Sequence, residues 1–406
     1  MRAVAVPVAW SRKTPARFAG RAGGTHTAVT RDGTAGGLTM GVEEEFLLAD
    51  PTTARAVPGA RAVLRRAHHE ASAADGSGYK AEFLSSQVES ATGVCTSLEE
   101  IRGELAEDRA RLVDAAREEG LLLLSSGTAV LSDGRPPVAE GERFRRISEL
   151  FADIVDDYQV CGCHVHVGVP DRETAVAVVN RVRRWLPTLL ALSVNSPFCE
   201  GRDRGYASWR MMEQLRFPAA GMPPRFPDAA FHDAEVARLV SYGALIDDRM
   251  SFWLMRPSPW LPTVEFRVAD AAATVDDAVL QAALGRALVR RALAELEAGV
   301  PEPELDERAA RAAVWSAARY GLRGDGVDPV TRARVPAGEL LQALLRHVAP
   351  ALEETGDTEA VRRLLETVRE DGTGAERQRR AWARGGPRAV VELLAAQTDA
   401  REHKRA

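Results

Sequence analysis

Four stretches of the sequence alternate apolar residues with charged or imidazole-bearing ones, which predicts β-strands with one apolar and one polar face. They are GVEEEFLL at 41–48, EFLSSQVES at 82–90, CGCHVHVGV at 161–169 and TVEFRVAD at 263–270. The first strand is predicted over 38–50, where Asp-Pro closes it. An apolar run at 121–126 predicts a short buried strand, and a further strand is predicted near 250–256.

Helical periodicity accounts for most of the remaining chain. Ser97 and Glu100 have the spacing of a capping box, which predicts a helix that ends at Gly120. A helix that begins at Asp171 and runs through Trp185 should kink or break at Pro187. Other helices are predicted at 60–69, 141–155 and 233–246, then at 276–299, 308–320, 338–347, 358–370 and 375–396. Strands followed by helices indicate an α+β fold with a helical C-terminal third.

Composition narrows the class of protein. Of 406 residues, 45% are hydrophobic and 27% charged, which is typical of a globular chain with a core of normal size. A net charge of -5 with mixed signs argues against nucleic acid as a partner. The absence of a long apolar run argues against a membrane span. Four cysteines in so long a chain favour a reducing cytoplasm. A homodimer is the base-rate expectation.

The chain is expected to form one domain after an N-terminal extension. Residues 1–37 are rich in glycine, alanine, threonine and arginine, and we expect them to be disordered. Residues 38–400 are interpreted as a single domain, of which 275–400 is mainly helical.

Glu43 and Glu45 share one face of the first strand, with Val42 and Phe46 on the other. Two carboxylates on one face repel unless a cation lies between them. The alternative is a solvated face of an antiparallel sheet. Glu44 falls on the Val42 side, where we expect a solvated or edge position.

In CGCHVHVGV, His164 and His166 share one face while Cys161 and Cys163 share the opposite one. A zinc site that used all four side chains is excluded, because its ligands would point both ways from one strand. The cysteines are therefore interpreted as small core residues. The flanking glycines, 162 and 168, indicate that another group approaches the backbone closely.

The remaining polar faces add further charge. Glu265 and Arg267 point away from the apolar face of TVEFRVAD. Gln87 and Glu89 share a face, whereas Glu82 would lie opposite Glu89 in a regular strand. If both glutamates serve one site, a bulge or an irregular start must intervene.

If these polar faces belong to one curved sheet, they converge on a shared concavity. Such a cluster is too anionic to stand alone, and carboxylates with an occasional imidazole suit magnesium or manganese. Magnesium at such sites commonly also holds nucleotide phosphates. No Walker A motif occurs in the sequence. The residues therefore predict a metal–phosphate enzyme of another kind.

The order of these motifs, together with NSPFCEGRDRGYASWR and RPSPWLPTVEFRVAD, resembles the glutamate–cysteine ligase type 2 family of ATP-dependent carboxylate–amine ligases. The resemblance implies a glutamine-synthetase-like fold: a curved, mainly antiparallel sheet with helices outside it and the active site in its concave face. It also implies phosphorylation of the glutamate γ-carboxylate by ATP and attack by the amine of cysteine, with Mg²⁺ or Mn²⁺ at the phosphates.

The resemblance also implies roles for individual residues. Arg267 would neutralise the transferring phosphoryl group, with Glu45 as a second catalytic residue. Contacts with substrate or phosphate would come from His166, Arg202, Arg204, Tyr206 and Arg210, and the arginine-rich loop 200–210 would help to cover the site. The metal ligands would be Glu43, Glu45, Glu82, Glu89, His164 and Glu265.

Four alternatives stay open at this point. The first is a ligase of the same mechanism with a different acid or amine. The second is a phosphagen-type kinase that releases a stable phosphorylated product. The third is a non-catalytic nucleotide- or metabolite-binding protein on the same fold. The fourth is a metal hydrolase without ATP dependence.

Overall fold

A computed structural model describes residues 37–67, 77–134 and 136–401. The expected disorder of 1–37 therefore lies outside the described residues, apart from Gly37. The described residues all belong to one compact unit. No helix in the described part of the chain combines the length and apolar character needed to cross a membrane.

The centre of this unit is a seven-stranded sheet in which every pair of neighbouring strands is antiparallel. The strand order is β10-β11-β5-β1-β3-β2, and β4 also pairs with β1. The strands are β1 (Met40–Ala49), β2 (Gly78–Ala81), β3 (Gln87–Ala91), β4 (Leu122–Leu124), β5 (Gly162–Gly168), β10 (Met255–Pro257) and β11 (Thr263–Asp270). All four patterned stretches therefore enter one sheet, and their strands, β11, β5, β1 and β3, are consecutive neighbours in it.

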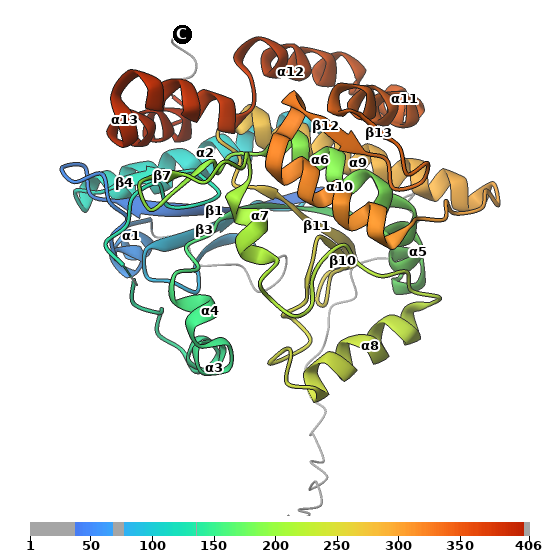
Figure 1. Ribbon diagram of the computed structural model, residues 1–406, viewed down its shortest axis with the longest axis horizontal. Helices are drawn as coiled ribbons and strands as arrows, with labels where there is room; N and C mark the ends of the chain where they lie inside the picture. The colour runs from blue at the N-terminus through green and yellow to red at the C-terminus, as the bar shows by residue number, and fades with distance from the viewer. Residues whose placement is uncertain (1–36, 68–76, 135, 402–406) are drawn as a thin grey trace, which may run out of the picture. The chain divides into compact units, whose positions relative to one another are not determined.

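The helices lie outside the sheet (Figure 1). They are α1 (Ala60–Ala67), α2 (Leu98–Glu118), α3 (Glu142–Phe151), α4 (Asp153–Asp156), α5 (Arg172–Val182), α6 (Leu186–Ser193), α7 (Trp209–Gln214), α8 (Ala229–Ser241), α9 (Val275–Glu297), α10 (Glu307–Tyr320), α11 (Ala337–Thr355), α12 (Thr358–Asp371) and α13 (Gly374–Thr398). Three short strand pairs complete the fold: β6 (Phe198–Cys199) with β7 (Arg202–Asp203), β8 (Ala220–Gly221) with β9 (Phe252–Trp253), and β12 (Asp325–Val327) with β13 (Arg334–Pro336).

The apolar face of the sheet packs on helices. Val42, Val165 and Phe266 belong to one hydrophobic cluster with residues of α2, α5, α6 and α9. Gly285 of α9 faces Val165 and Phe266, where an added Cβ atom would make ordinary van der Waals contacts of 3.4–3.6 Å. Covering this face with helices leaves the polar face of the same strands directed to the other side, where Figure 1 shows α3, α4 and α8.

Local signals in the sequence explain several helix boundaries. Ser97 caps α2 in a complete capping box with Glu100, and Asp171 caps α5. The predicted break at Pro187 is confirmed, because a 3₁₀ turn at Arg183–Trp185 separates α5 from α6 and the proline opens α6.

Other boundaries differ from the prediction. The helix predicted over 141–155 is interrupted at Ala152, whose φ of 45° is incompatible with a continuous helix. The helix predicted at 233–246 begins earlier, at Ala229, because Asp228 caps it. The strand predicted from residue 82 begins only at Gln87, after a turn.

The prediction that Cys161 and Cys163 are core residues is confirmed. Both thiols are free and buried in hydrophobic clusters, on the face of β5 opposite the histidines. The close approach predicted from the glycines is also found. A Cβ atom at Gly162 would collide with the guanidinium of Arg210, and one at Gly168 would collide with Thr39.

The expectation that Glu44 is solvated is wrong. Its side chain is 1% exposed, and Arg109 of α2, which is 0% exposed, binds both of its carboxylate oxygens at 2.6 and 2.9 Å. Arg109 also donates to the carbonyl of Ala272 at 2.7 Å. The Val42 side of β1 faces α2, and helix α2 supplies the counter-charge that makes burial of a carboxylate tolerable.

Removal of Arg109 alone should therefore be strongly destabilising. Arg109→Met leaves a buried carboxylate without its partner, and we expect it to lower the free energy of unfolding by about 3–5 kcal/mol. Glu44→Gln combined with Arg109→Met should recover part of that loss. Urea denaturation followed by circular dichroism measures both. Arg363→Met, at an exposed ion pair with Glu359, serves as the matched control and should change stability by less than about 0.5 kcal/mol.

Candidate active site

A cavity of about 740 Å³ opens on the polar face of the sheet. Its lining brings together the residues predicted as metal ligands, namely Glu43, Glu45, Glu82, Glu89, His164 and Glu265, along with His166, Arg210 and Arg267. The alternating faces of four strands thus converge in one concavity, as the polar pattern predicts.

Strand register sets the neighbours of each charge. Glu43 lies opposite His164, and Glu45 lies opposite Glu89. His166 lies opposite Glu265. Directly opposed residues in antiparallel strands have their Cβ atoms about 4.5–5.5 Å apart, so each pair is in reach of one small ion.

Glu82 joins Glu89 because the chain between them is irregular. A turn at 85–86 precedes β3, which begins at Gln87. The turn reverses the side to which Glu82 would point in a regular strand. The irregular start required by the sequence pattern is therefore present, and both glutamates line the same cavity.

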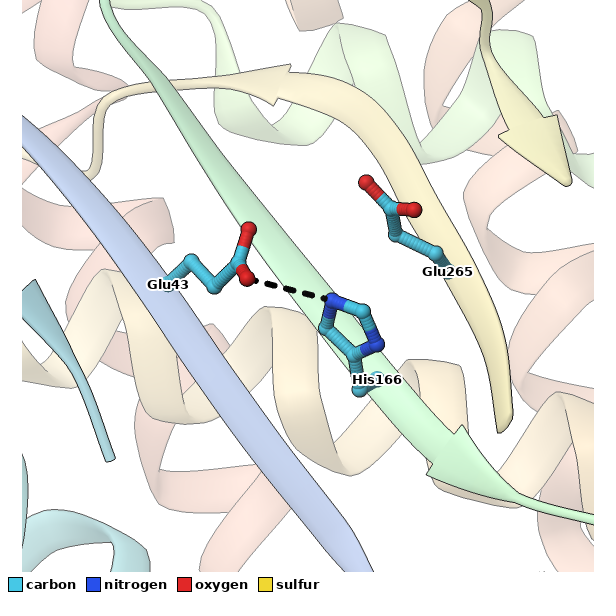
Figure 2. A group of neighbouring side chains, drawn as sticks. All are labelled: Glu43, His166 and Glu265. Carbon is cyan, nitrogen blue, oxygen red and sulfur yellow. Dashed lines mark ion pairs between the residues drawn. The ribbon is translucent and has the colours of Figure 1, made fainter. Parts of the chain in front are cut away.

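Glu43, His166 and Glu265 form a first group with metal-ligand geometry (Figure 2). One ligand atom of each lies within 4.8 Å of the others, and the side chains come from β1, β5 and β11. His166 Nδ1 lies 3.0 Å from the Thr263 hydroxyl, which directs Nε2 toward Glu43 Oε1 at 3.6 Å.

The resemblance implies His164 rather than His166 as the imidazole ligand, and the geometry differs from that assignment. His164 lies between two carboxylates, with Nδ1 3.3 Å from Glu43 Oε2 and Nε2 3.8 Å from Glu45 Oε1. His166 completes the three-residue group instead. The metal-binding role of either histidine stays a prediction.

Glu45, Glu82 and Glu89 form a second group, again with one oxygen of each within 4.8 Å of the others. Lys80 of β2 sits beside it, with Nζ 2.8 Å from Glu89 Oε1 and 3.9 Å from Glu43 Oε1. This lysine is a cation that the strand pattern did not single out, although it lies directly opposite Glu89 in the β2–β3 register.

Burial and mutual repulsion act on the second group. Burial, with the charge of Glu82, raises the pKa of Glu45 to about 7. Burial and the charge of Glu43 hold the pKa of Glu89 well above its usual range. Glu45 and Glu89 therefore resist ionisation at neutral pH, which is the electrostatic condition that a divalent cation relieves.

In the first group, neighbouring positive charges and imidazoles outweigh burial, and the carboxylate pKa values are lowered. Burial opposes ionisation of Glu43, but its hydrogen bond with His164 and the nearby imidazole of His166 outweigh burial and lower its pKa. Burial likewise opposes ionisation of Glu265, and the charges of Arg256 and Arg267 outweigh it and lower its pKa. These two carboxylates are ionised at neutral pH and offer anionic oxygens to a ligand.

The residues present fit magnesium or manganese. Their donors are carboxylate oxygens with imidazole nitrogens, which these cations accept. Burial, helped by Arg267, lowers the pKa of His164 to about 4, so this imidazole is neutral at physiological pH. The Nε2 atoms of His164 and His166 are buried and have no hydrogen-bond partner among the described residues.

Two arginines offer donors for an anion. Arg267 pairs with Glu265, and Arg210 donates from Nη2 to the carbonyl of Arg267 at 3.2 Å. Within the described part of the chain, Arg267 Nε and Arg210 Nε and Nη1 are buried without a hydrogen-bond partner. Buried guanidinium donors of this kind suit phosphate or carboxylate oxygens.

Arg202, Arg204 and Tyr206 are not among the described residues that line the cavity. Arg202 is exposed and pairs with Glu200, as does Arg204. The hydroxyl of Tyr206 accepts a hydrogen bond from Trp315 at 3.2 Å. The β6–β7 hairpin and its local ion pairs hold these side chains elsewhere. Loop 200–210 therefore contributes only Arg210 to the lining.

Arg256 of β10 is a site residue that the sequence pattern missed. It lies opposite Glu265 in the register, and its guanidinium binds both carboxylate oxygens, at 2.7 and 3.2 Å. Its strand was predicted near 250–256, but strand position alone does not show which residue faces Glu265.

Comparison with known proteins identifies the family of this chain. The model of glutamate–cysteine ligase family 2 matches residues 39–400. Two relatives from Saccharopolyspora erythraea, named as candidate glutamate–cysteine ligases 2-2 and 2-1, are 56% and 46% identical to this chain. The alignments cover 89% of this chain and 93% of the first relative, and 86% of this chain and 91% of the second.

Solved structures show the fold. A crystal structure of a glutamate–cysteine ligase from Francisella tularensis in complex with AMP superposes with a TM-score of 0.64. The alignment covers 89% of each chain at 12% sequence identity. The likeness confirms the predicted fold class, an antiparallel sheet with outer helices and a helical C-terminal part.

The raised pKa of Glu45 generates a test. Because its folded pKa of about 7 exceeds the unfolded value of 4.5, the stability associated with protonated Glu45 is present at low pH and is lost as pH rises from the unfolded to the folded pKa. In EDTA, Glu45→Gln should therefore melt at a progressively higher temperature relative to the wild type between about pH 5 and pH 7, and the difference should level off above that.

With magnesium at about pH 8, the wild type should melt at a higher temperature than Glu45→Gln. The cation stabilises the wild type, whereas Glu45→Gln has lost one anionic ligand. Differential scanning fluorimetry with EDTA or MgCl₂ measures both effects. Glu107→Gln, at an exposed helical ion pair, is the control and should show neither. A melting difference that does not vary with pH would contradict the electrostatic account of this group.

Proposed function

This chain belongs to glutamate–cysteine ligase family 2, and we propose that it is an ATP-dependent ligase that joins the γ-carboxylate of glutamate to the amine of cysteine. The products are γ-glutamylcysteine, ADP and phosphate. The observation that carries the proposal is the convergence of five glutamates, two histidines and five arginines on one cavity. We place this activity in a single catalytic domain over residues 38–400.

The carboxylate groups account for cation binding. Glu43, His166 and Glu265 would hold one Mg²⁺ or Mn²⁺, and Glu45, Glu82 and Glu89 a second. When bound, the cations supply positive charge to the phosphate oxygens of ATP and to the acyl oxygen. The AMP bound to the glutamate–cysteine ligase from Francisella tularensis supports a nucleotide substrate.

The arginines account for phosphoryl transfer. A glutamate carboxylate oxygen attacks the γ-phosphorus of ATP, the bond to the β–γ bridging oxygen breaks, and ADP leaves. Negative charge spreads over the transferring group, and Arg267 with Arg210 offers unpaired guanidinium donors to it. In the second step the amine attacks the acyl carbon, loses a proton and expels phosphate.

The acyl phosphate must be protected from water between the two steps. Aromatic and aliphatic side chains from outside the sheet line part of the cavity, including Phe144, Ile147, Phe217 and Phe252. All four belong to one hydrophobic cluster. This apolar wall is the water-excluding element that the site contains, in place of the predicted loop 200–210.

The acid and the amine are the less constrained part of the proposal. The cation groups and Arg267 act on ATP and the carboxylate and would serve any substrate pair with the same mechanism. We also propose a cytoplasmic location, supported by four free thiols. Association into a homodimer stays a prediction.

Incubation with ATP, MgCl₂ and a panel of amino acids tests the reaction directly. We expect mass spectrometry to detect glutamate and cysteine joined with loss of one water, and ADP and phosphate in equal amounts. A stable phosphorylated product without an amide would instead identify a kinase. ATP-independent hydrolysis would identify a metal hydrolase, and absence of turnover with every pair would favour a binding protein.

Removal of Arg267 tests whether its positive charge stabilises the transferring phosphoryl group. Arg267→Met should reduce kcat by about 10²–10³-fold and raise the KM for ATP much less, because its charge is needed most in the transition state. Steady-state ADP release measures both constants. Arg238→Met, at an ion pair on the outer helix α8, is the control and should leave both nearly unchanged. An unchanged kcat in Arg267→Met would defeat this role.

Glu265→Gln removes an anionic oxygen from the first group without changing its size. We expect loss of Mg²⁺-dependent ADP release and weakened Mn²⁺ binding, while the thermal unfolding profile stays cooperative. Mn²⁺ binding followed by electron paramagnetic resonance separates a lost ligand from a lost fold. Full turnover in Glu265→Gln would remove this residue from the site.

A further inference from the structure

An exposed tryptophan lies at the cavity, and the reaction described above does not use it. Trp260 is in the connection between β10 and β11 and is 61% exposed. The Arg249 guanidinium carbon lies 3.9 Å from the centre of the indole ring. Both side chains line the cavity. Other exposed aromatic residues, among them Tyr242 and Trp315, are not in its lining.

Hydrogen bonds connect the pair of Trp260 and Arg249 to the first group of possible metal ligands, which contains Glu265. Arg256 donates from Nη1 to the carbonyls of Arg249 at 2.8 Å and Ser251 at 3.0 Å. The same guanidinium binds Glu265. The buried guanidinium of Arg256 therefore connects the loop that carries Arg249 with Glu265, a carboxylate of the group that would face the triphosphate.

The other side of the pair is connected as well. The Ser258 hydroxyl accepts hydrogen bonds from the backbone N–H groups of Trp260 and Leu261, at 3.4 and 3.3 Å. Thr263, three residues after Trp260, contacts His166 Nδ1. The turn that presents the indole thus continues directly into the strand that carries Glu265.

The chemistry of Trp260 and Arg249 indicates which class of ligand they would bind. An amino-acid ammonium is disfavoured there, because Arg249 already occupies the indole with a positive charge. A substrate carboxylate would bind more favourably to the buried guanidinium donors of Arg210 and Arg267 than to the indole. A flat, uncharged heterocycle gains from stacking on the exposed indole and from the adjacent guanidinium plane.

We propose that Trp260, supported by Arg249, stacks on the purine base of ATP at the outer end of the cavity. This assignment rests on the proposed function, because it takes the group of Glu43, His166 and Glu265 as the binding place of the triphosphate. It adds the base-binding element, which the carboxylates and the buried arginines do not provide.

The test compares two ligands that share phosphates and differ in the base. Binding of Mg²⁺–ATP and of Mg²⁺–tripolyphosphate is measured by isothermal titration calorimetry. Trp260→Ala should weaken ATP binding by about tenfold, the effect expected for loss of one base–aromatic stack. The same variant should change tripolyphosphate binding less than about twofold. Trp260→Phe should retain most of the ATP affinity, because phenylalanine keeps a stacking face.

Two further variants sharpen the result. Tyr242→Ala removes an exposed aromatic side chain outside the cavity lining and should leave both affinities unchanged. Arg249→Met should weaken ATP more than tripolyphosphate, as expected for support of a stack rather than a phosphate contact. Tryptophan fluorescence of Trp260→Phe should also lose the ATP-dependent change of the wild type.

Equal loss of both ligands in Trp260→Ala, or undiminished ATP binding, would overturn the assignment. If the wild type binds ATP tightly and Trp260→Ala does too, only the base-binding inference fails. If the wild type binds neither ATP nor tripolyphosphate in the presence of Mg²⁺, the proposed function fails with it.

Discussion

The repulsion among carboxylates on one face of an antiparallel sheet is the constraint on which this site depends. Cross-strand register places Glu45 opposite Glu89 and brings Glu82 beside both, with one oxygen of each within 4.8 Å of the others. Burial makes that proximity costly, as the raised pKa values of Glu45 and Glu89 show. A fold that holds such a cluster gains by binding a divalent cation, so the electrostatic cost and the proposed function have one origin.

The protein offsets this cost locally rather than by a general excess of positive charge. Lys80 pairs with Glu89, and Arg256 with Arg267 surrounds Glu265. On the opposite face of β1, Arg109 does the same for Glu44. Each buried carboxylate in these pairs has a cation supplied by a neighbouring strand or helix. Among the described residues, Arg210 and Arg267 combine buried guanidinium nitrogens that have no hydrogen-bond partner with a place in the cavity lining, where a substrate anion would complete them.

The arrangement also separates the chemical tasks in space. Buried guanidinium groups suit the transferring phosphoryl group and a substrate carboxylate, while the exposed indole of Trp260 suits an uncharged base. The two carboxylate groups line the same cavity and draw on β1, β3, β5, β11 and the segment before β3. Apolar side chains from α3, together with Phe217 and Phe252, line part of the same space. Phosphoryl transfer to a carboxylate requires in-line positioning of the reactants, positive charge near the phosphoryl oxygens and exclusion of water from the site.

The sequence by itself determined which faces of four strands are polar, because side chains alternate strictly along a strand, and it predicted the helix start at Ser97 and the break at Pro187. Only the tertiary structure decided which polar residues meet. Strand register selected His166 for the group with Glu43 and Glu265, and put Arg256 opposite Glu265. Helix α2 buried Glu44, and the β6–β7 hairpin kept Arg202 out of the cavity lining. Pairing between distant segments has no local signature, since it depends on the relative positions of strands and helices that are far apart in the chain.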